Sequence, residues 1–178
     1  MLTGLNIGSG QRRFEDVPEV IKWWNIDCVT RPPDQIPDMV CDVGREPLNF
    51  ADGSVDVCVL HQVYEHFGLG EGHGIIKECH RVLRDGGSLI ITIPDMQALA
   101  KRWLLGQITD YIYFVNVYGA YQGQEGDRHK FGYTYEGLRA DFQNIPCAWS
   151  DMSRFDWRKI EGADIARDWW ILGVEAVK

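Results

Sequence analysis

The stretch that decides the fold begins with Val55-Asp-Val-Cys-Val-Leu60 and ends with Gly86-Gly87 followed by Ser88-Leu-Ile-Ile-Thr-Ile93. The first and last runs are short, apolar and rich in β-branched residues, as buried strands are. Between them, apolar residues recur at helical spacing, and charged residues occupy the other face. The apolar positions are Ile75, Ile76, Cys79, Val82 and Leu83. We predict a helix that the two glycines terminate, and therefore a strand-helix-strand crossover with parallel strands.

Three further strand-like runs precede this unit, at residues 5–7, 24–29 and 39–43, and each ends in small or acidic residues. Runs that are apolar on both faces are typical of parallel sheets covered by helices on both sides. The segment between the first two runs is short and contains Pro18, so we expect its helix to be reduced to a turn or two. The prediction is an α/β fold with a mostly parallel sheet and helices on both faces.

The second half of the chain is more aromatic. We predict helices at 95–105 and 108–118, a loop at 119–132, a helix at 135–142 capped by Thr134, and strands near 148–150 and 169–177. Residues 95–135 have two open interpretations, an acceptor lid or ordinary core packing. Their aromatic residues are Trp103, Tyr111, Tyr113, Phe114, Tyr118, Tyr121, Phe131, Tyr133 and Tyr135.

Length and composition limit the class of protein. A chain of 178 residues, 45% of them hydrophobic, suits one domain spanning residues 1–178. No apolar run approaches the roughly 20 residues of a membrane span, and no basic-then-apolar leader opens the sequence, so we expect a cytoplasmic protein without membrane contact. The formal net charge of -8 disfavours nucleic acid as a partner. Five scattered cysteines favour free thiols over disulfides or a zinc knuckle.

Chemistry-bearing residues follow the first strand. Leu5-Asn-Ile-Gly-Ser-Gly10 places two glycines where bare backbone lets a nucleoside-bearing cofactor approach the sheet edge. The carbonyl of Asn6 is a candidate acceptor for the ammonium group of such a cofactor. Arg13 stands where a dinucleotide-binding fingerprint would have a third glycine, which counts against a nicotinamide or flavin enzyme.

The next strand ends add suitable groups. Asp27 follows the second run at a distance at which a carboxylate accepts from both ribose hydroxyls. Asp42 follows the third run and is a candidate acceptor for an adenine amino group, with the N–H of Val43 beside it. His61-Gln62 stand at the exit of the fourth run, where the reacting end of a cofactor and its acceptor would lie.

Taken together, these motifs closely resemble class I S-adenosylmethionine-dependent methyltransferases. Within that family, the sequence is most similar to small methyltransferases of the type 11 kind associated with sugar and polysaccharide pathways. The resemblance runs from about Leu5 to Asp95 and includes Asn-Ile-Asp, Cys-Asp-Val, Tyr-Glu-His-Phe and Ile-Pro-Asp. It implies a single Rossmann-like domain with a seven-stranded sheet whose last strand is antiparallel, and S-adenosylmethionine as the cofactor. The expected cofactor-binding residues are Asn6, Gly8, Ser9, Gly10, Asp27, Cys28, Asp42, Val43, His61 and Gln62.

The reaction expected from the resemblance is O- or N-methylation of a small-molecule acceptor, such as a sugar or nucleotide-sugar. His129 and His61 are the catalytic candidates, because imidazole titrates near neutrality. We predict no metal site, because no His-x-x-x-His or tight acid pair occurs in the sequence. Two alternatives stay open: a non-catalytic cofactor-binding protein and a nucleotide-binding oxidoreductase, although the latter would be expected to carry a Tyr-x-x-x-Lys pair.

Overall fold

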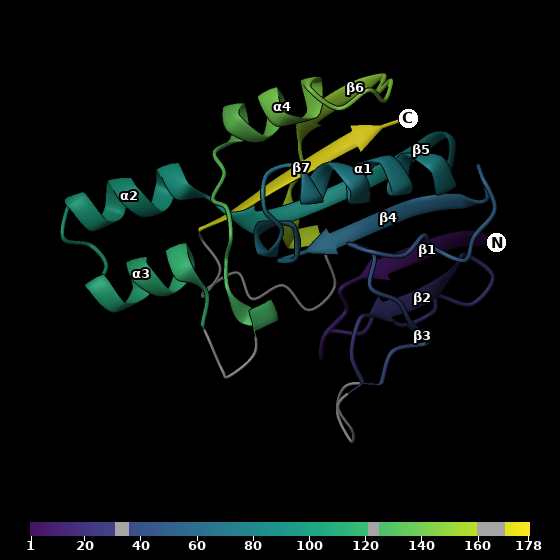
Figure 1. The fold of residues 1–178 in the computed structure, drawn as a ribbon, viewed down its shortest axis with the longest axis horizontal. Coiled ribbons are helices and arrows are strands. Elements are labelled where there is room, and N and C mark those ends of the chain that lie inside the picture. The colour runs from purple at the N-terminus through teal and green to yellow at the C-terminus, as the bar shows by residue number, and fades with distance from the viewer. Residues whose placement is uncertain (31–35, 121–124, 160–169) are drawn as a thin grey trace.

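The computed structural model describes residues 1–30, 36–120, 125–159 and 170–178. They contain one seven-stranded sheet in the order β3-β2-β1-β4-β5-β7-β6 (Figure 1). The strands are β1 Leu2–Ile7, β2 Ile21–Asp27, β3 Met39–Val40, β4 Val55–His61, β5 Leu83–Pro94, β6 Asp151–Arg154 and β7 Ile171–Val177. Neighbours among β1 to β5 pair in parallel, whereas β7 is antiparallel to both β5 and β6. The predicted α/β architecture with a mostly parallel seven-stranded sheet is confirmed.

Helices and short 3-10 turns connect the strands. The helices are α1 Glu71–Val82, α2 Met96–Leu104, α3 Asp110–Tyr118 and α4 Tyr135–Gln143, and the turns are η1 Tyr64–His66, η2 Glu125–Asp127 and η3 Trp157–Lys159. Figure 1 shows α1 and α4 lying over one face of the sheet, while α2 and α3 extend beyond the end at which the parallel strands terminate. Within the described residues, no helix is long and apolar enough to cross a bilayer.

The two faces of the sheet are covered unequally. The main core joins sheet residues such as Leu5 and Ile91 to Ile76 of α1 and Phe142 of α4. The opposite face carries a smaller cluster around Phe14 and Val59. In the described part of the chain no helix packs on that face, so the prediction of helices on both faces is not confirmed.

Residues 8–20 explain this asymmetry. Where a turn or two of helix was expected, the chain forms turns and an extended loop. Two buried amides hold the loop against the sheet: Asn6 Nδ2 donates to the carbonyl of Arg12 (2.7 Å), and Asn25 exchanges hydrogen bonds with both backbone groups of Phe14 (2.7 and 3.1 Å). These bonds satisfy backbone groups of Arg12 and Phe14, so this part of the loop needs no helix to pair them.

Several predicted boundaries shift. Helix α1 ends at Val82, because Leu83 already pairs with Val55, so Gly86-Gly87 lie inside β5 and do not terminate the helix. The third strand ends at Val40 rather than at residue 43, and β6 begins at Asp151 rather than near residue 148. Position 169 lies outside the described residues. Thr134 caps α4 as predicted, because its Oγ1 accepts from the N–H of Gly137 at 3.1 Å.

Candidate functional site

The turn after β1 is built on two glycines in the left-handed region. Gly8 has φ +69° and Gly10 has φ +52°. A Cβ added to Gly8 would lie 2.5 Å from a methyl group of Val63, whereas one on Gly10 would meet none of the described residues within 4 Å. The hydroxyl of Ser9 is buried and has no hydrogen-bond partner among the described residues, so it is an orphan polar group in the turn.

Asp27 connects this turn to the end of β2. One of its carboxylate oxygens accepts from the N–H of Gly10 (2.8 Å) and the other accepts from the N–H of Val29 (3.1 Å). A carboxylate offers about four lone-pair positions, so both oxygens retain acceptor capacity for a ligand's hydroxyls. Asp27 is 8% exposed, whereas Cys28, the next residue, is exposed.

Asp42 lies just past the end of β3. It accepts from the N–H of Gly44 (3.1 Å), and its second oxygen lies 3.5 Å from the guanidinium of Arg45. Val43 packs partly buried against the main core. Because β3, β2 and β1 are adjacent in the sheet, Asp42, Asp27 and the glycine turn follow successive strands at one edge.

The side-chain amide of Asn6 has a structural task that the sequence did not indicate. Asn6 is buried, and its Nδ2 donates both to the carbonyl of Arg12 and to Oδ1 of Asn25 (2.9 Å). Both amide hydrogens therefore hold the loop that follows the glycine turn.

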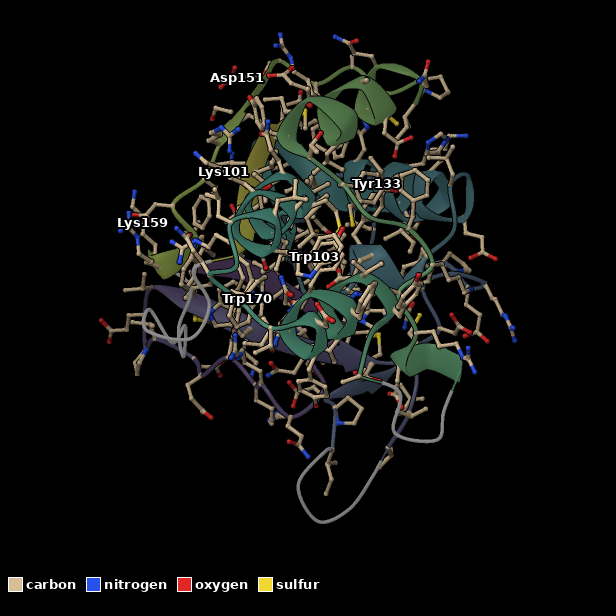
Figure 2. The ribbon with its side chains drawn as sticks, turned by 90° about the vertical axis from the view of Figure 1, so that its left-hand side faces the viewer. Lys101, Trp103, Tyr133, Asp151, Lys159 and Trp170 are labelled. Carbon is tan, nitrogen blue, oxygen red and sulfur yellow. The ribbon has the colours of Figure 1, made fainter. Side chains whose placement is uncertain are left out.

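A cavity of about 390 Å³ lies beside the exit of β4. Its walls come from the loop after β1, from the exit of β4, from α3 and the residues that follow it, and from the start of β7. The lining residues are Arg12, His61, Gln62, Val115, Asn116, Ala120, His129, Trp170 and Ile171. Figure 2 shows Trp170 and Trp103 on the side of the molecule that carries α2 and α3. The fold thus brings three predicted site residues together, while Arg12, Asn116 and Trp170 had no signal in the sequence.

Gln62 carries two marks of a functional position. Its φ of +56° is in the left-handed region, which is costly for a residue with a side chain. Its Nε2 is buried without a hydrogen-bond partner among the described residues. A strained backbone that places an unsatisfied amide in a cavity wall favours a role in ligand binding.

His61 is held by two neighbours. The guanidinium of Arg12 contacts Nε2, and Nδ1 lies 2.6 Å from Oγ1 of Thr92. A guanidinium only donates, so Nε2 accepts and Nδ1 carries the proton. Burial, assisted by the positive charge of Arg12, lowers the pKa of His61 to about 4. With its lone pair occupied, His61 is better suited to positioning Arg12 than to removing a proton.

The depressed pKa of His61 predicts a stability change with pH. In the unfolded chain His61 takes up a proton near pH 6.5, but in the folded protein it does so only near pH 4. Its contribution is therefore fully present above pH 6.5 and is lost as the pH falls toward 4, by up to about 3 kcal/mol. Urea unfolding of wild type and His61→Gln should show the stability difference shrinking from pH 7 to pH 4.5, and a constant difference would contradict the lowered pKa.

Comparison with known proteins now gives the class of this fold. The family model described as a methyltransferase domain matches residues 15–91, from the loop before β2 to the middle of β5. Residues 15–91 are therefore similar to a methyltransferase domain. The sequence predictions of a methyltransferase and of S-adenosylmethionine as its cofactor are both confirmed. A search of curated proteins finds no match.

Solved structures of similar fold are methyltransferases as well. An S-adenosylmethionine-dependent methyltransferase from Archaeoglobus fulgidus shares 13% identity over 99% of this chain and 86% of its own, with a TM-score of 0.60. A putative methyltransferase of Haloferax volcanii, in complex with the Trm112 activator, shares 15% over 98% and 81%, with a TM-score of 0.57. The 1,6-didemethyltoxoflavin-N1-methyltransferase of Burkholderia thailandensis, with S-adenosylhomocysteine bound, shares 14% over 99% and 70%, with a TM-score of 0.60. At these identities the likeness establishes the fold.

His129 reaches the methyltransferase cavity from the loop after α3. Its Nδ1 lies 2.8 Å from the carbonyl of Asn116, and burial lowers its pKa. A carbonyl oxygen only accepts, so Nδ1 donates and the lone pair of the neutral ring is on Nε2. Of the two catalytic candidates, His129 is therefore the one whose ring nitrogen is not engaged by a cation.

Some aromatic residues of the segment 95–135 fit core packing, and others fit the acceptor lid. Tyr133 is 3% exposed and belongs to the main core, packed against Tyr64 at a ring separation of 5.3 Å. Trp103 of α2 stacks on Tyr113 of α3 at 4.5 Å, and the neighbouring Tyr111 is 77% exposed. Tyr133, near the end of this segment, is therefore a core residue. The aromatic residues of α2 and α3, at its beginning, lie in a helical hairpin outside the main core. Tyr121 lies outside the described residues.

Proposed function

We propose that this protein transfers the methyl group of S-adenosylmethionine to an oxygen or nitrogen atom of a small-molecule acceptor. The observation that carries the proposal is the placement of the cavity: it adjoins the exit of β4, next along the sheet from the cofactor-binding groups at the ends of β1, β2 and β3. Methyl transfer from a sulfonium is an in-line displacement, so alignment of acceptor and methyl group supplies much of the rate.

The residues at these strand ends suit the chemical groups of S-adenosylmethionine. The bare backbone at Gly8 and Gly10 and the orphan hydroxyl of Ser9 accommodate the cofactor beside β1, and the free lone pairs of Asp27 accept from its ribose. Asp42 with the N–H of Val43 is proposed for the adenine. The proposed cofactor site also includes Asn6, Cys28, His61 and Gln62, at the ends of β1, β2 and β4.

The acceptor is proposed to enter the cavity between Gln62 and the α2–α3 hairpin, with that hairpin as its cover. The Burkholderia relative acts on 1,6-didemethyltoxoflavin, a small molecule, and the family resemblance adds sugars and nucleotide-sugars as first candidates. A net charge of -8 favours such acceptors over nucleic acid, and we propose that the reaction takes place in the cytoplasm.

The first experiment is calorimetric titration with S-adenosylmethionine, S-adenosylhomocysteine and NAD in parallel. Saturable binding of the first two, without NAD, is the expected result. Binding of NAD alone, or of none of the three, would overturn the proposal in favour of the oxidoreductase or of an unrelated interaction protein. Tight binding followed by no turnover on any screened acceptor would support the non-catalytic alternative.

The proposed base is tested separately. His129→Ala is expected to leave the affinity for S-adenosylhomocysteine within about twofold and to lower turnover on an identified acceptor roughly 100-fold or more, as loss of acid-base assistance typically does. The matched control is His80→Ala, because His80 lies on α1, where its Nε2 lies 3.0 Å from the carbonyl of Ala148. Unchanged turnover of His129→Ala would remove His129 from the reaction.

A further inference from the structure

Three potential ligand side chains meet at the edge of the cavity. Glu65 and His66 lie in η1, directly after the cavity residues of β4, and His129 reaches them from the loop after α3. Each offers one ligand atom, and these atoms lie within 4.8 Å of one another. The two imidazole rings pack edge to face with centroids 4.8 Å apart.

Hydrogen bonds fix which nitrogen each histidine presents. Nδ1 of His66 lies 3.1 Å from the carbonyl of Arg128, and Nδ1 of His129 lies 2.8 Å from the carbonyl of Asn116. Carbonyl oxygens only accept, so both Nδ1 atoms are donors and both Nε2 atoms carry the lone pairs. A backbone carbonyl that accepts from Nδ1 holds each imidazole in the orientation that histidine needs for binding a metal through Nε2.

The carboxylate of Glu65 supplies an independent observation. Glu65 is 1% exposed, and neither of its carboxylate oxygens has a hydrogen-bond partner among the described residues. A buried carboxylate without partners is costly, and such groups are normally neutralised by a proton, a cationic side chain or a metal ion. Because neither oxygen accepts a hydrogen bond from a lysine or arginine side chain among the described residues, a proton or a metal ion is left to neutralise the carboxylate.

We propose that Glu65, His66 and His129 bind one divalent transition-metal ion. Two imidazoles and one carboxylate suit Zn²⁺, Co²⁺ or Mn²⁺ better than Mg²⁺ or Ca²⁺, which prefer oxygen ligands alone. Ligands bonded to one ion at about 2.0–2.2 Å lie about 3–4 Å apart, so small side-chain rotations bring these three atoms onto one ion.

The position of this metal site gives it a role that depends on the proposed methyl transfer. Three protein ligands leave at least one coordination position open, as in catalytic metal sites. His129 also lines the cavity, so the open position is available to an acceptor oxygen next to Gln62. A bound ion would lower the pKa of an acceptor hydroxyl, and His129 would then serve as a ligand of the ion instead of as the base.

The site is tested by titrating Co²⁺ alone into chelator-treated protein, with d-d absorption and calorimetry as readouts. Wild type is expected to bind one Co²⁺ per chain, and Zn²⁺ to displace it. Glu65→Gln, His66→Gln and His129→Gln should each weaken binding by roughly tenfold or more. His80→Gln, a histidine outside the cluster, should bind as wild type does.

Thermal unfolding separates loss of a ligand from loss of the fold. Without metal, Glu65→Gln should melt at or above the wild-type temperature, because the substitution removes an unsatisfied acid from the interior. With Zn²⁺ added at equal concentration to every protein, wild type and His80→Gln should gain more stability than the three ligand variants. Failure of wild type to bind either Co²⁺ or Zn²⁺, or binding by all three ligand variants as tight as that of wild type, would overturn the proposal. Since S-adenosylmethionine is absent throughout, the outcome is independent of the calorimetric test of the cofactor.

Discussion

Replacing Asp27 by alanine is expected to lower the affinity for S-adenosylhomocysteine by roughly 100-fold or more. Each hydrogen bond to a charged group contributes about 1.5–3 kcal/mol, and two ribose hydroxyls are proposed to bind this carboxylate. Alanine also removes the acceptor for the N–H of Gly10, so the glycine turn that supports the cofactor loses one of its anchors.

Two further variants make this prediction specific. Asp27→Asn keeps one acceptor oxygen without the charge and should bind the ligand with intermediate affinity. Asp85→Ala changes an exposed acid of β5 and should leave affinity unchanged. Calorimetry with all three proteins is the measurement, and undiminished affinity of Asp27→Ala would remove Asp27 from the proposed cofactor site.

Gly8→Ala is expected to destabilise the protein by about 2–4 kcal/mol and to abolish measurable cofactor binding. Left-handed backbone costs a residue with a side chain about 1–2 kcal/mol, and the new Cβ would also lie 2.5 Å from a methyl group of Val63. Gly10→Ala is the matched control, because its φ is also positive but a Cβ there has no neighbour within 4 Å in the part of the chain that the structure describes. Gly10→Ala should therefore cost only the conformational part.

A double variant checks the cause of this difference. Val63→Ala in the Gly8→Ala background removes the contacted methyl groups, and it should restore part of the stability that Gly8→Ala loses, measured against Val63→Ala alone. Urea unfolding of the four proteins completes a double-mutant cycle. Equal stabilities of Gly8→Ala and Gly10→Ala would show that contact with Val63 has no influence.

The strands and most helices of this protein were predictable because their signals are local. Val55 to Leu60 is apolar on both faces, and Thr134 caps the helix that follows it, so neighbouring residues carry the information. The end of α1 was misplaced because it is set by pairing of Leu83 with Val55, a contact between distant positions. The missing first helix depends on Asn6 and Asn25, whose amides read from sequence as ordinary polar residues.

Some residues of the candidate site were likewise predictable from local sequence, and others were not. Glycines and acids that follow strands are visible in sequence, since parallel strands bring their carboxyl ends to one edge. The sequence by itself therefore determined the α/β class and the strand ends proposed to hold a cofactor, and its resemblance to class I methyltransferases implied S-adenosylmethionine as that cofactor. Only the tertiary structure decided that Arg12 occupies the lone pair of His61, and that His129 lies against Glu65 and His66. The reason is physical: periodicity and turn chemistry depend on adjacent residues, whereas a hydrogen-bond partner or a shared ligand position depends on how loops far apart in the chain pack together.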